Sequence, residues 1–194
     1  MKTLGMRVVV AMCGATLLGG LTCASPRAAS HERQAATSAA TETRPEANPK
    51  DVESLDAIIA AIYNVISGPA GERDWNRFRS LFIPEGRLTA VRVAKDGKIS
   101  YVMMSVEDYV NRAGSHFKEQ GFFESEASRK TETFGQMAHV YTTYESRNAK
   151  DAAPFARGIN SIELFNDGKR WWCVSIYWDS ERPGNPIPEK YLSH

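Results

Sequence analysis

The sequence predicts an α+β domain in which helices pack on the concave face of a curved antiparallel sheet of about six strands. The predicted order is two helices, a hairpin, a third helix and then four long strands, from the helical or strand-like spacing of the apolar residues. Asp96-Gly97 and Asp167-Gly168 each separate two of the predicted strands. Asp-Gly is the dipeptide that a tight type I′ hairpin turn favours, so both sites predict hairpins.

The three predicted helices lie in the N-terminal half of the domain. The first covers Asp51 to Ser67, and Gly68-Pro69 ends it; the second runs from about Arg73 to Phe82. The third begins after Ser105, which has the position of an N-cap residue, with Asp108 in the capping-box position. Gly121 closes this helix, and all three present an apolar face to the sheet.

The predicted strands form two hairpins and a long meander. They cover Arg87 to Val93, Lys98 to Met104, Phe122 to Phe134, Met137 to Arg147, and the two halves of residues 157–179. Period-two alternation assigns their faces. On the last strand it places Trp172, Val174, Ile176 and Trp178 inside, and Trp171, Cys173, Ser175 and Tyr177 outside.

The chain divides into a signal peptide (residues 1–24), a linker (25–50), the folded domain (51–181) and an extended tail (182–194). Lys2 and Arg7 precede a hydrophobic run of about 14 residues, Val8 to Leu21, which is the layout of a secretory signal. The linker contains no large apolar residue and cannot form a core. We therefore expect an exported protein, periplasmic or secreted. Membrane attachment is expected only if Cys23 carries a lipid.

Charge and cysteine content exclude several classes of function. Loss of residues 1–24 removes two positive charges, so the formal net charge falls from +1 to −1. A nearly neutral chain gives no electrostatic reason to bind nucleic acid. Cys173 is the single cysteine beyond the leader, so no internal disulfide is expected. The four histidines are scattered, and we expect neither a metal site nor a cofactor.

Three segments resemble the nuclear transport factor two-like superfamily, in its bacterial SnoaL-like branch. They are DWNRFRSLFIPEGRL (74–88), GQMAHVYTTYESR (135–147) and the hairpin RGINSIELFNDGKRWWCVSIYWD (157–179). The resemblance covers residues 51–180 and implies a cone-like pocket between sheet and helices, often with a dimer across the outer sheet face. Enzymes of this superfamily use a buried Asp, Glu or His, but no such position carries over to a residue here. The fold also serves binding and dimerisation.

The predicted pocket has an aromatic wall with a few neutral polar groups. Its expected lining is Tyr63, Trp75, Tyr109, Thr142, Tyr144, Asn160 and Trp178. This face assignment puts no carboxylate or imidazole inside, which suits a small apolar ligand better than proton transfer. Plain packing of the same side chains is the alternative reading.

His139 and Glu163 are the candidates for acid–base catalysis. Alternation puts both on the outer face, and a register slip of one residue would turn both inward. The same outer face is predicted to carry Trp171, Tyr177, Tyr141 and Phe165, an apolar patch that favours a homodimer.

The sequence thus predicts an exported pocket domain that binds a small molecule or dimerises without catalysis. The competing hypothesis is an isomerase or dehydratase with an acid–base residue in the cone pocket, which would require a buried carboxylate or histidine in the cavity.

Overall fold

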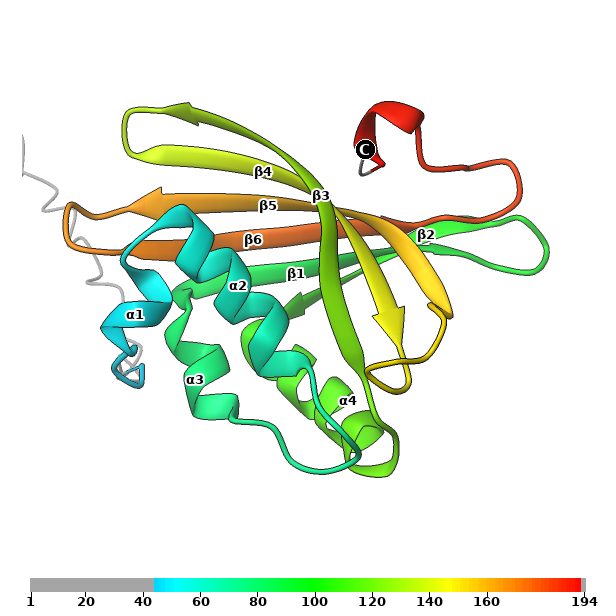
Figure 1. Cartoon of the computed structure of the whole chain (residues 1–194), viewed down its shortest axis with the longest axis horizontal. Coiled ribbons are helices and arrows are strands. Elements are labelled where there is room, and N and C mark those ends of the chain that lie inside the picture. Colours follow the sequence, from blue (N-terminus) through cyan, green and yellow to red (C-terminus); the bar gives the residue numbers. More distant parts are fainter. Residues whose placement is uncertain (1–43, 193–194) are drawn as a thin grey trace, which may run out of the picture. The chain divides into compact units, whose positions relative to one another are not determined.

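The computed structural model describes residues 44–192. Its elements in chain order are α1 (Pro49–Val52), α2 (Leu55–Ile66), α3 (Trp75–Ser80), β1 (Phe82–Val93), β2 (Ile99–Ser105), α4 (Val106–Glu119), β3 (Phe123–Phe134), β4 (Met137–Arg147), β5 (Ala156–Asn166), β6 (Trp171–Ser180) and the 3₁₀ helix η1 (Glu189–Tyr191). The helices α2, α3 and α4 lie against one side of a curved sheet, as predicted (Figure 1).

The six strands are hydrogen-bonded in the order β2-β1-β6-β5-β4-β3. Both predicted Asp-Gly hairpins form, and Gly97 and Gly168 take the positive φ angles, 82° and 88°, that such turns require. The sheet is mixed and not purely antiparallel, because β1 and β6 pair in parallel. Leu88 lies opposite Ile176 in that pair. The parallel pairing joins the first hairpin to the last one. The order of the strands along the sequence does not reveal this pairing.

The helices begin at side-chain caps. The predicted Asp51–Ser67 helix is two helices, because Ser54 interrupts it and accepts a hydrogen bond from Ala57 N (3.1 Å) as the cap of α2. The described residues therefore contain four α-helices and not three. The predicted capping box of α4 is present: Ser105 Oγ accepts from Asp108 N, and Asp108 Oδ2 accepts from Ser105 N.

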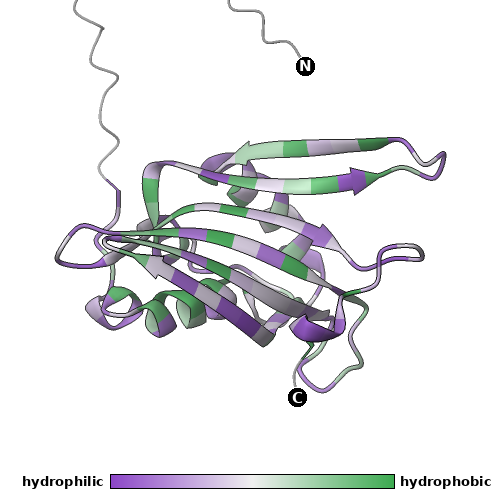
Figure 2. Cartoon of the chain, turned by 90° about the horizontal axis from the view of Figure 1, so that it is seen from above, coloured by the Kyte–Doolittle hydropathy of each residue, from purple (hydrophilic) through white to green (hydrophobic). Residues whose placement is uncertain are grey.

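The core fills the space between the helices and the inner face of the sheet. Ile58 and Ile59 of α2, Phe78 of α3 and Phe82 of β1 are almost completely buried. The Phe78 ring lies 4.9 Å from the Phe82 ring. Figure 2 shows hydrophobic and hydrophilic positions alternating along several strands, as expected for a sheet with one covered face.

Two β-bulges change which residues face the core. In β3 the register shifts between Glu126 and Ser128, so Ala127 is an extra residue. In β6, Glu163 pairs with Ser175 and Leu164 with Cys173, so Val174 is extra. Each bulge reverses the alternation on one side of itself.

The bulge at Val174 corrects the predicted faces of β6. Ile176 is buried inside as expected, and Trp178 packs against the core. Cys173, predicted outside, is fully buried, and Trp171 packs against the core as well. Trp172, predicted inside, lies under the Arg170 guanidinium, which is 3.6 Å from the ring, and donates to Asp167 Oδ2. Trp171 is therefore not part of an outer apolar patch.

Both ends of the described chain contact the domain. Arg44, placed in the linker by the sequence, donates to Arg79 O and Pro84 O. In the tail, the Tyr191 ring lies 4.9 Å from the Tyr141 ring on the outer face.

The predicted signal peptide, most of the linker and Cys23 lie outside the described residues, so export remains a prediction. No helix within residues 44–192 is long and apolar enough to cross a membrane.

The position of Cys173 can be tested by thiol reactivity. Burial of the thiol raises its pKa, and the thiolate is the reactive form. With Cys13 and Cys23 replaced by Ser, we expect Cys173 in the native chain to react with a disulfide reagent at least about 100-fold more slowly than in urea. Equal rates in the native and unfolded chain would contradict the buried position and hence the β6 register.

Candidate functional site

A cavity of about 400 Å³ lies between the sheet and the helices. Its walls are mainly apolar and come from α2, α3, α4, five of the strands and the segment between β4 and β5. The apolar lining is Ile62, Ile66, Phe78, Leu88, Tyr109, Phe122, Tyr144, Phe155, Ala156, Ile176 and Trp178. The structure thus contains a hollow where the predicted fold requires a cone-like pocket.

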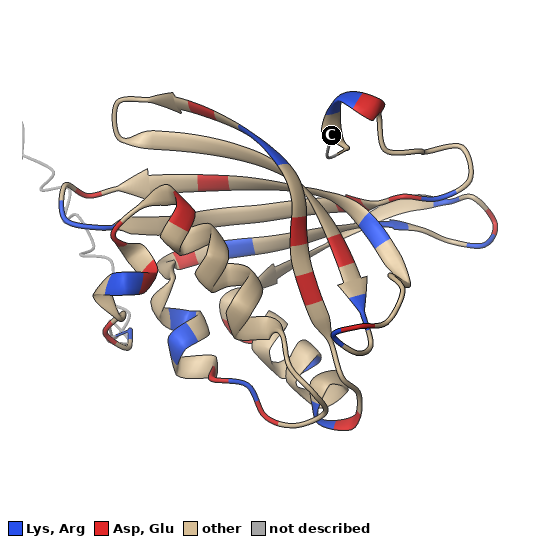
Figure 3. Cartoon of the chain, viewed as in Figure 1, with Lys and Arg blue, Asp and Glu red and all other residues tan. Residues whose placement is uncertain are grey.

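Five polar or charged residues interrupt this apolar lining. Glu124, Ser146 and Asn160 are contributed by β3, β4 and β5, while Arg92 comes from β1 and His116 from α4. Ser146 and Asn160 are buried, whereas Arg92 and His116 are exposed at the opening. Glu124 is the single acidic residue of the lining, and Figure 3 shows acidic positions on the part of β3 that passes α2.

Glu124 faces the cavity because of the bulge at Ala127. It pairs with Ser146, on the inner face of β4, and the Ser146 hydroxyl donates to Glu124 Oε2 at 2.8 Å. Without the bulge, the register from the Phe134–Met137 pair would place Glu124 opposite Arg147, on the other face. One extra residue therefore converts an outward carboxylate into an inward one.

The backbone of Glu124 is attached to the end of α2. Glu124 N donates to Ser67 Oγ at 2.9 Å, and the same hydroxyl lies 2.7 Å from Tyr63 O and 3.1 Å from Glu124 O. Just beside it, Gly68 and Phe122 exchange two backbone hydrogen bonds of 2.7 and 3.0 Å. These contacts hold the start of β3 against the helix and fix the depth at which the carboxyl enters the cavity.

Burial raises the pKa of Glu124 to about 7, because the cavity and its walls solvate the charged form poorly. Hydrogen bonds from Ser146 and from the Asn160 amide lower this pKa, without offsetting the desolvation. The residue retains a partly exposed surface, and that surface faces the cavity. At neutral pH, Glu124 is therefore present in both protonation states and is open to a bound molecule.

Three aromatic residues predicted for the pocket line it: Tyr109, Tyr144 and Trp178. Tyr144 lies across Gly158, where a Cβ atom would come within 2.5 Å of Tyr144 Oη. The Tyr144 hydroxyl shares a hydrogen bond of 2.9 Å with Ser180 Oγ. Desolvation raises the pKa of Tyr109, so its hydroxyl stays protonated at neutral pH. Within residues 44–192 this hydroxyl has no hydrogen-bond partner.

The other predicted lining residues have different positions. Asn160 lines the cavity and its amide donates to Tyr63 Oη at 3.2 Å. Tyr63 and Thr142 are buried behind the wall and share a hydrogen bond of 3.0 Å. Trp75 packs against Phe117 and does not line the cavity. These three supporting residues shape the pocket without bounding it.

His139 and Glu163 lie on the outer face, away from the cavity. His139 Nε2 is 2.9 Å from Ser161 Oγ and 3.9 Å from the Glu163 carboxylate. Tyr177 and Phe165 are also exposed there, whereas Tyr141 is covered by Tyr191. The predicted homodimer through this face remains a prediction.

The sequence reasoning did not place Glu124, Arg92 or His116 in the pocket. Contrary to the sequence expectation, the cavity contains a carboxylate and an imidazole. Glu124 was hidden by the bulge at Ala127, and a bulge in a polar strand has no clear sequence signal. His116 was hidden because it lies at the exposed margin of α4, beside the apolar stripe.

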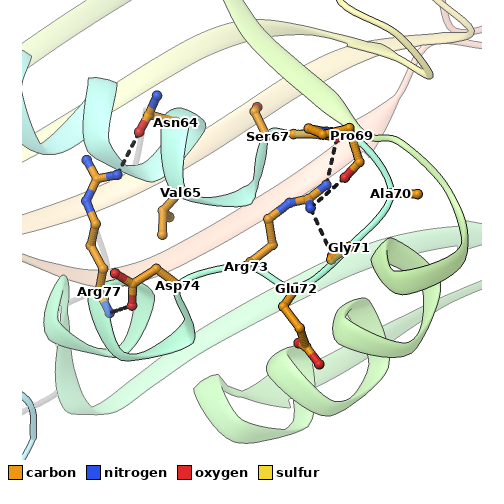
Figure 4. Close-up of a pocket in the computed structure, with 11 residues that line it drawn as sticks. Asn64, Val65, Ser67, Pro69, Ala70, Gly71, Glu72, Arg73, Asp74 and Arg77 are labelled. Atoms are coloured by element: carbon orange, nitrogen blue, oxygen red, sulfur yellow. Dashed lines mark hydrogen bonds between the residues drawn. The ribbon is translucent and has the colours of Figure 1, made fainter.

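A second depression, of about 270 Å³, surrounds the loop after α2 (Figure 4). Its cations are used structurally: Arg73 donates to the carbonyl oxygens of Ile66, Gly68, Pro69 and Gly71, which closes the end of α2. Arg77 bonds Asn64 and forms an ion pair with Asp51. We therefore assign this depression to the support of the fold.

Within residues 44–192, no group of three or more potential side-chain ligands is arranged to hold a metal ion.

No family model matches the chain, and no curated protein matches it by sequence. Solved structures do match. One is a proposed dehydratase of the NTF2-like family from Streptomyces avermitilis, with 12% identity and a TM-score of 0.51, covering 68% of this chain and 96% of that one. A protein of unknown function with a cystatin-like fold from Nostoc punctiforme has 9% identity and a TM-score of 0.50, covering 64% and 86%.

A third match is a protein of unknown function from Mycobacterium tuberculosis, with 14% identity and a TM-score of 0.51, covering 69% of this chain and 75% of that one. The domain therefore has the nuclear transport factor two-like, cystatin-like fold. At these identities the likeness concerns the fold alone, and function has to be argued from the cavity.

The raised pKa of Glu124 predicts a specific pH dependence of stability. The folded state holds this proton up to about pH 7, whereas an unfolded Glu releases it near 4.5. Between these values the native state binds more protons, so this group's contribution to stability is full below pH 4.5 and is lost as the pH rises through 7.

Relative to Glu124→Gln, the unmodified chain should therefore lose on the order of 1–3 kcal/mol of unfolding free energy between pH 5 and pH 8. Urea unfolding of both proteins across that range measures the difference. If the unfolding free energies of the two proteins change with pH in the same way, Glu124 is solvated like a surface carboxylate.

Proposed function

We propose that this domain is an acid–base enzyme that binds a small, mainly apolar molecule in its cavity and uses Glu124 to transfer a proton. The observation that carries the proposal is a carboxyl group with a pKa near 7 in the wall of an apolar cavity. This is the feature that separates the enzymatic hypothesis from simple binding. The fold supports it as a scaffold for such cavities but does not select the chemistry.

The cavity has the size and composition of a small-molecule site. Ligand pockets typically enclose about 300–1,000 Å³ and combine apolar walls with a few placed polar groups. The volume of about 400 Å³ falls in this range, and Trp178, Tyr144 and Ile176 provide flat and aliphatic surface. Such walls favour a ring or a short branched chain over a strongly polar substrate.

The protonation behaviour of Glu124 fits general acid–base catalysis. A group whose pKa lies near the working pH is both a competent base and, once protonated, a competent acid. The Glu124 carboxylate takes a proton from a carbon next to a carbonyl, and the C–H electron pair moves into the enolate. Return of the proton to another carbon gives isomerisation, and loss of a β-hydroxyl with that proton gives dehydration.

Tyr109 supplies the complementary group for the substrate oxygen. Its hydroxyl remains protonated at neutral pH and has no partner in the described part of the chain. A donor of this kind stabilises the negative charge that develops on an enolate oxygen. We assign Glu124 as the proton-transfer group and Tyr109 as the donor to the substrate oxygen.

Binding without catalysis is the second candidate. Below pH 7 the protonated Glu124 is itself a hydrogen-bond donor in an apolar site, which suits recognition of a neutral carbonyl compound. This function predicts that a co-purifying small molecule, detected by native mass spectrometry, is retained by the Glu124→Gln variant, whose amide still donates. It also predicts no base-catalysed turnover.

The experiment uses 5-nitrobenzisoxazole, a small flat molecule whose ring opens when one base removes its C–H proton. We expect turnover that rises with pH through about 7 and falls by about 100-fold or more in Glu124→Gln, the range for loss of a general base. Glu163→Gln is the matched control, because this carboxylate lies on the outer face and should leave turnover unchanged.

Two outcomes would contradict the catalytic assignment. Turnover no faster than that of free acetate would show that Glu124 does not meet a bound molecule in a poorly solvated site. Turnover that survives Glu124→Gln but falls in Glu163→Gln would move the reaction to the outer face.

A further inference from the structure

Arg92 places a positive charge at the opening of the cavity. It lies near the end of β1, opposite Ser100 of the edge strand β2, and its side chain is exposed while lining the cavity. Glu124 lies on β3, at the opposite edge of the sheet. The curvature of the sheet brings both strands to one cavity, so a bound molecule has a cation at one side and a carboxyl group at the other (Figure 1).

The Arg92 guanidinium has no partner of its own. Within residues 44–192 it makes no hydrogen bond and no ion pair. Other arginines on the same face of the fold are occupied: Arg77 pairs with Asp51, and Arg129 pairs with Asp56 and Glu126. Arg92 is thus the arginine of the cavity lining that is available to a ligand.

The charges around the cavity favour an anion near Arg92. Glu124 is the single acidic residue of the lining, and a growing fraction of it is protonated and neutral as the pH falls through about 7. Burial raises the pKa of the Tyr144 hydroxyl, Glu124 and Asp179 raise it further and Arg92 lowers it, yet within residues 44–192 Arg92 forms no ion pair with an acidic side chain. An anion at Arg92 therefore does not have to displace an internal ion pair.

We propose that the ligand of this cavity is an amphipathic carboxylic acid whose carboxylate binds Arg92 while its apolar body extends past Trp178 and Tyr144 toward Glu124. The proposal rests on the function proposed above and names its substrate class. A guanidinium binds a carboxylate through two parallel hydrogen bonds, which fixes orientation as well as position. Bound in this way, the apolar end of the molecule is presented to the proton-transfer group.

The test compares two probes of nearly the same shape, the anion 3-phenylpropanoate and the neutral amide 3-phenylpropanamide. Their dissociation constants are measured by NMR titration of the full chain and of three variants, two at Arg92 and one control. Arg92→Gln should weaken 3-phenylpropanoate at least about fivefold, the loss expected for one charged hydrogen-bonded pair near solvent. The same substitution should change the dissociation constant of 3-phenylpropanamide by no more than about twofold. Arg92→Lys should restore part of the preference for the carboxylate, because lysine keeps the positive charge but cannot form the two parallel hydrogen bonds of a guanidinium.

Arg112→Gln is the matched control, since Arg112 is exposed on α4 and is not part of the lining. The proposal is overturned if Arg92→Gln weakens both probes equally, or neither, or if Arg112→Gln has the same effect.

These readings are independent of catalysis. Turnover of 5-nitrobenzisoxazole without any preference for the carboxylate would retain the proposed function and reject the ligand class. An Arg92-dependent preference without turnover would retain the ligand class and reject the proton transfer.

Discussion

The inward position of Glu124 depends on a single extra residue in strand β3. Strands β3 and β4 form a regular antiparallel pair from their turn up to Ser128, and continued regularly this register would turn Glu124 outward. The bulge at Ala127 reverses the faces beyond it, so that Glu124 lies opposite Ser146 and within the cavity. Bulges commonly re-aim a side chain next to a functional site, and here the re-aimed side chain is the acidic one.

The same arrangement links stability to chemistry. Ser67 and Gly68 attach the start of β3 to the end of α2, so the strand cannot turn Glu124 to the outer face without breaking these contacts. The cavity then raises the pKa of Glu124, and the Ser146 hydroxyl limits the increase. The folded state thereby carries a carboxyl group that is unfavourable when ionised, which is the usual cost of a base with a pKa near neutrality.

The elements of this fold are largely predictable from local patterns. The capping box of α4, both Asp-Gly turns and the apolar alternation of β4 and β5 are strong signals, and each corresponds to an observed feature. The parallel pairing of β1 with β6 is not a local property, because it depends on how two hairpins meet in space. One helix was predicted from Asp51 because the apolar spacing continues through Ser54, whereas in the structure this serine caps α2 and divides the segment.

The strand part of the candidate site was less predictable because it was assigned with the period-two rule, which a bulge breaks. Tyr109, Tyr144, Asn160 and Trp178 line the cavity, Tyr109 from the inner side of α4 and the other three from strands that keep their register around these residues. Cys173 was assigned to the wrong face and Glu124 was not recognised as a lining residue, because each lies beyond a bulge that reverses the alternation. Neither Ala127 nor Val174 is of a residue type that indicates a bulge. The sequence therefore does not predict where the inward and outward faces of these strands exchange.

The most direct measurement is the titration of the Glu124 carboxyl carbon by NMR, assigned with the Glu124→Gln variant. The account predicts a midpoint near pH 7 and a still higher midpoint in Ser146→Ala, because that variant removes a hydrogen bond that favours the charged form. A midpoint near 4.5, the ordinary value for a glutamic acid, together with no response to Ser146→Ala, would place the carboxyl group in water and contradict the account.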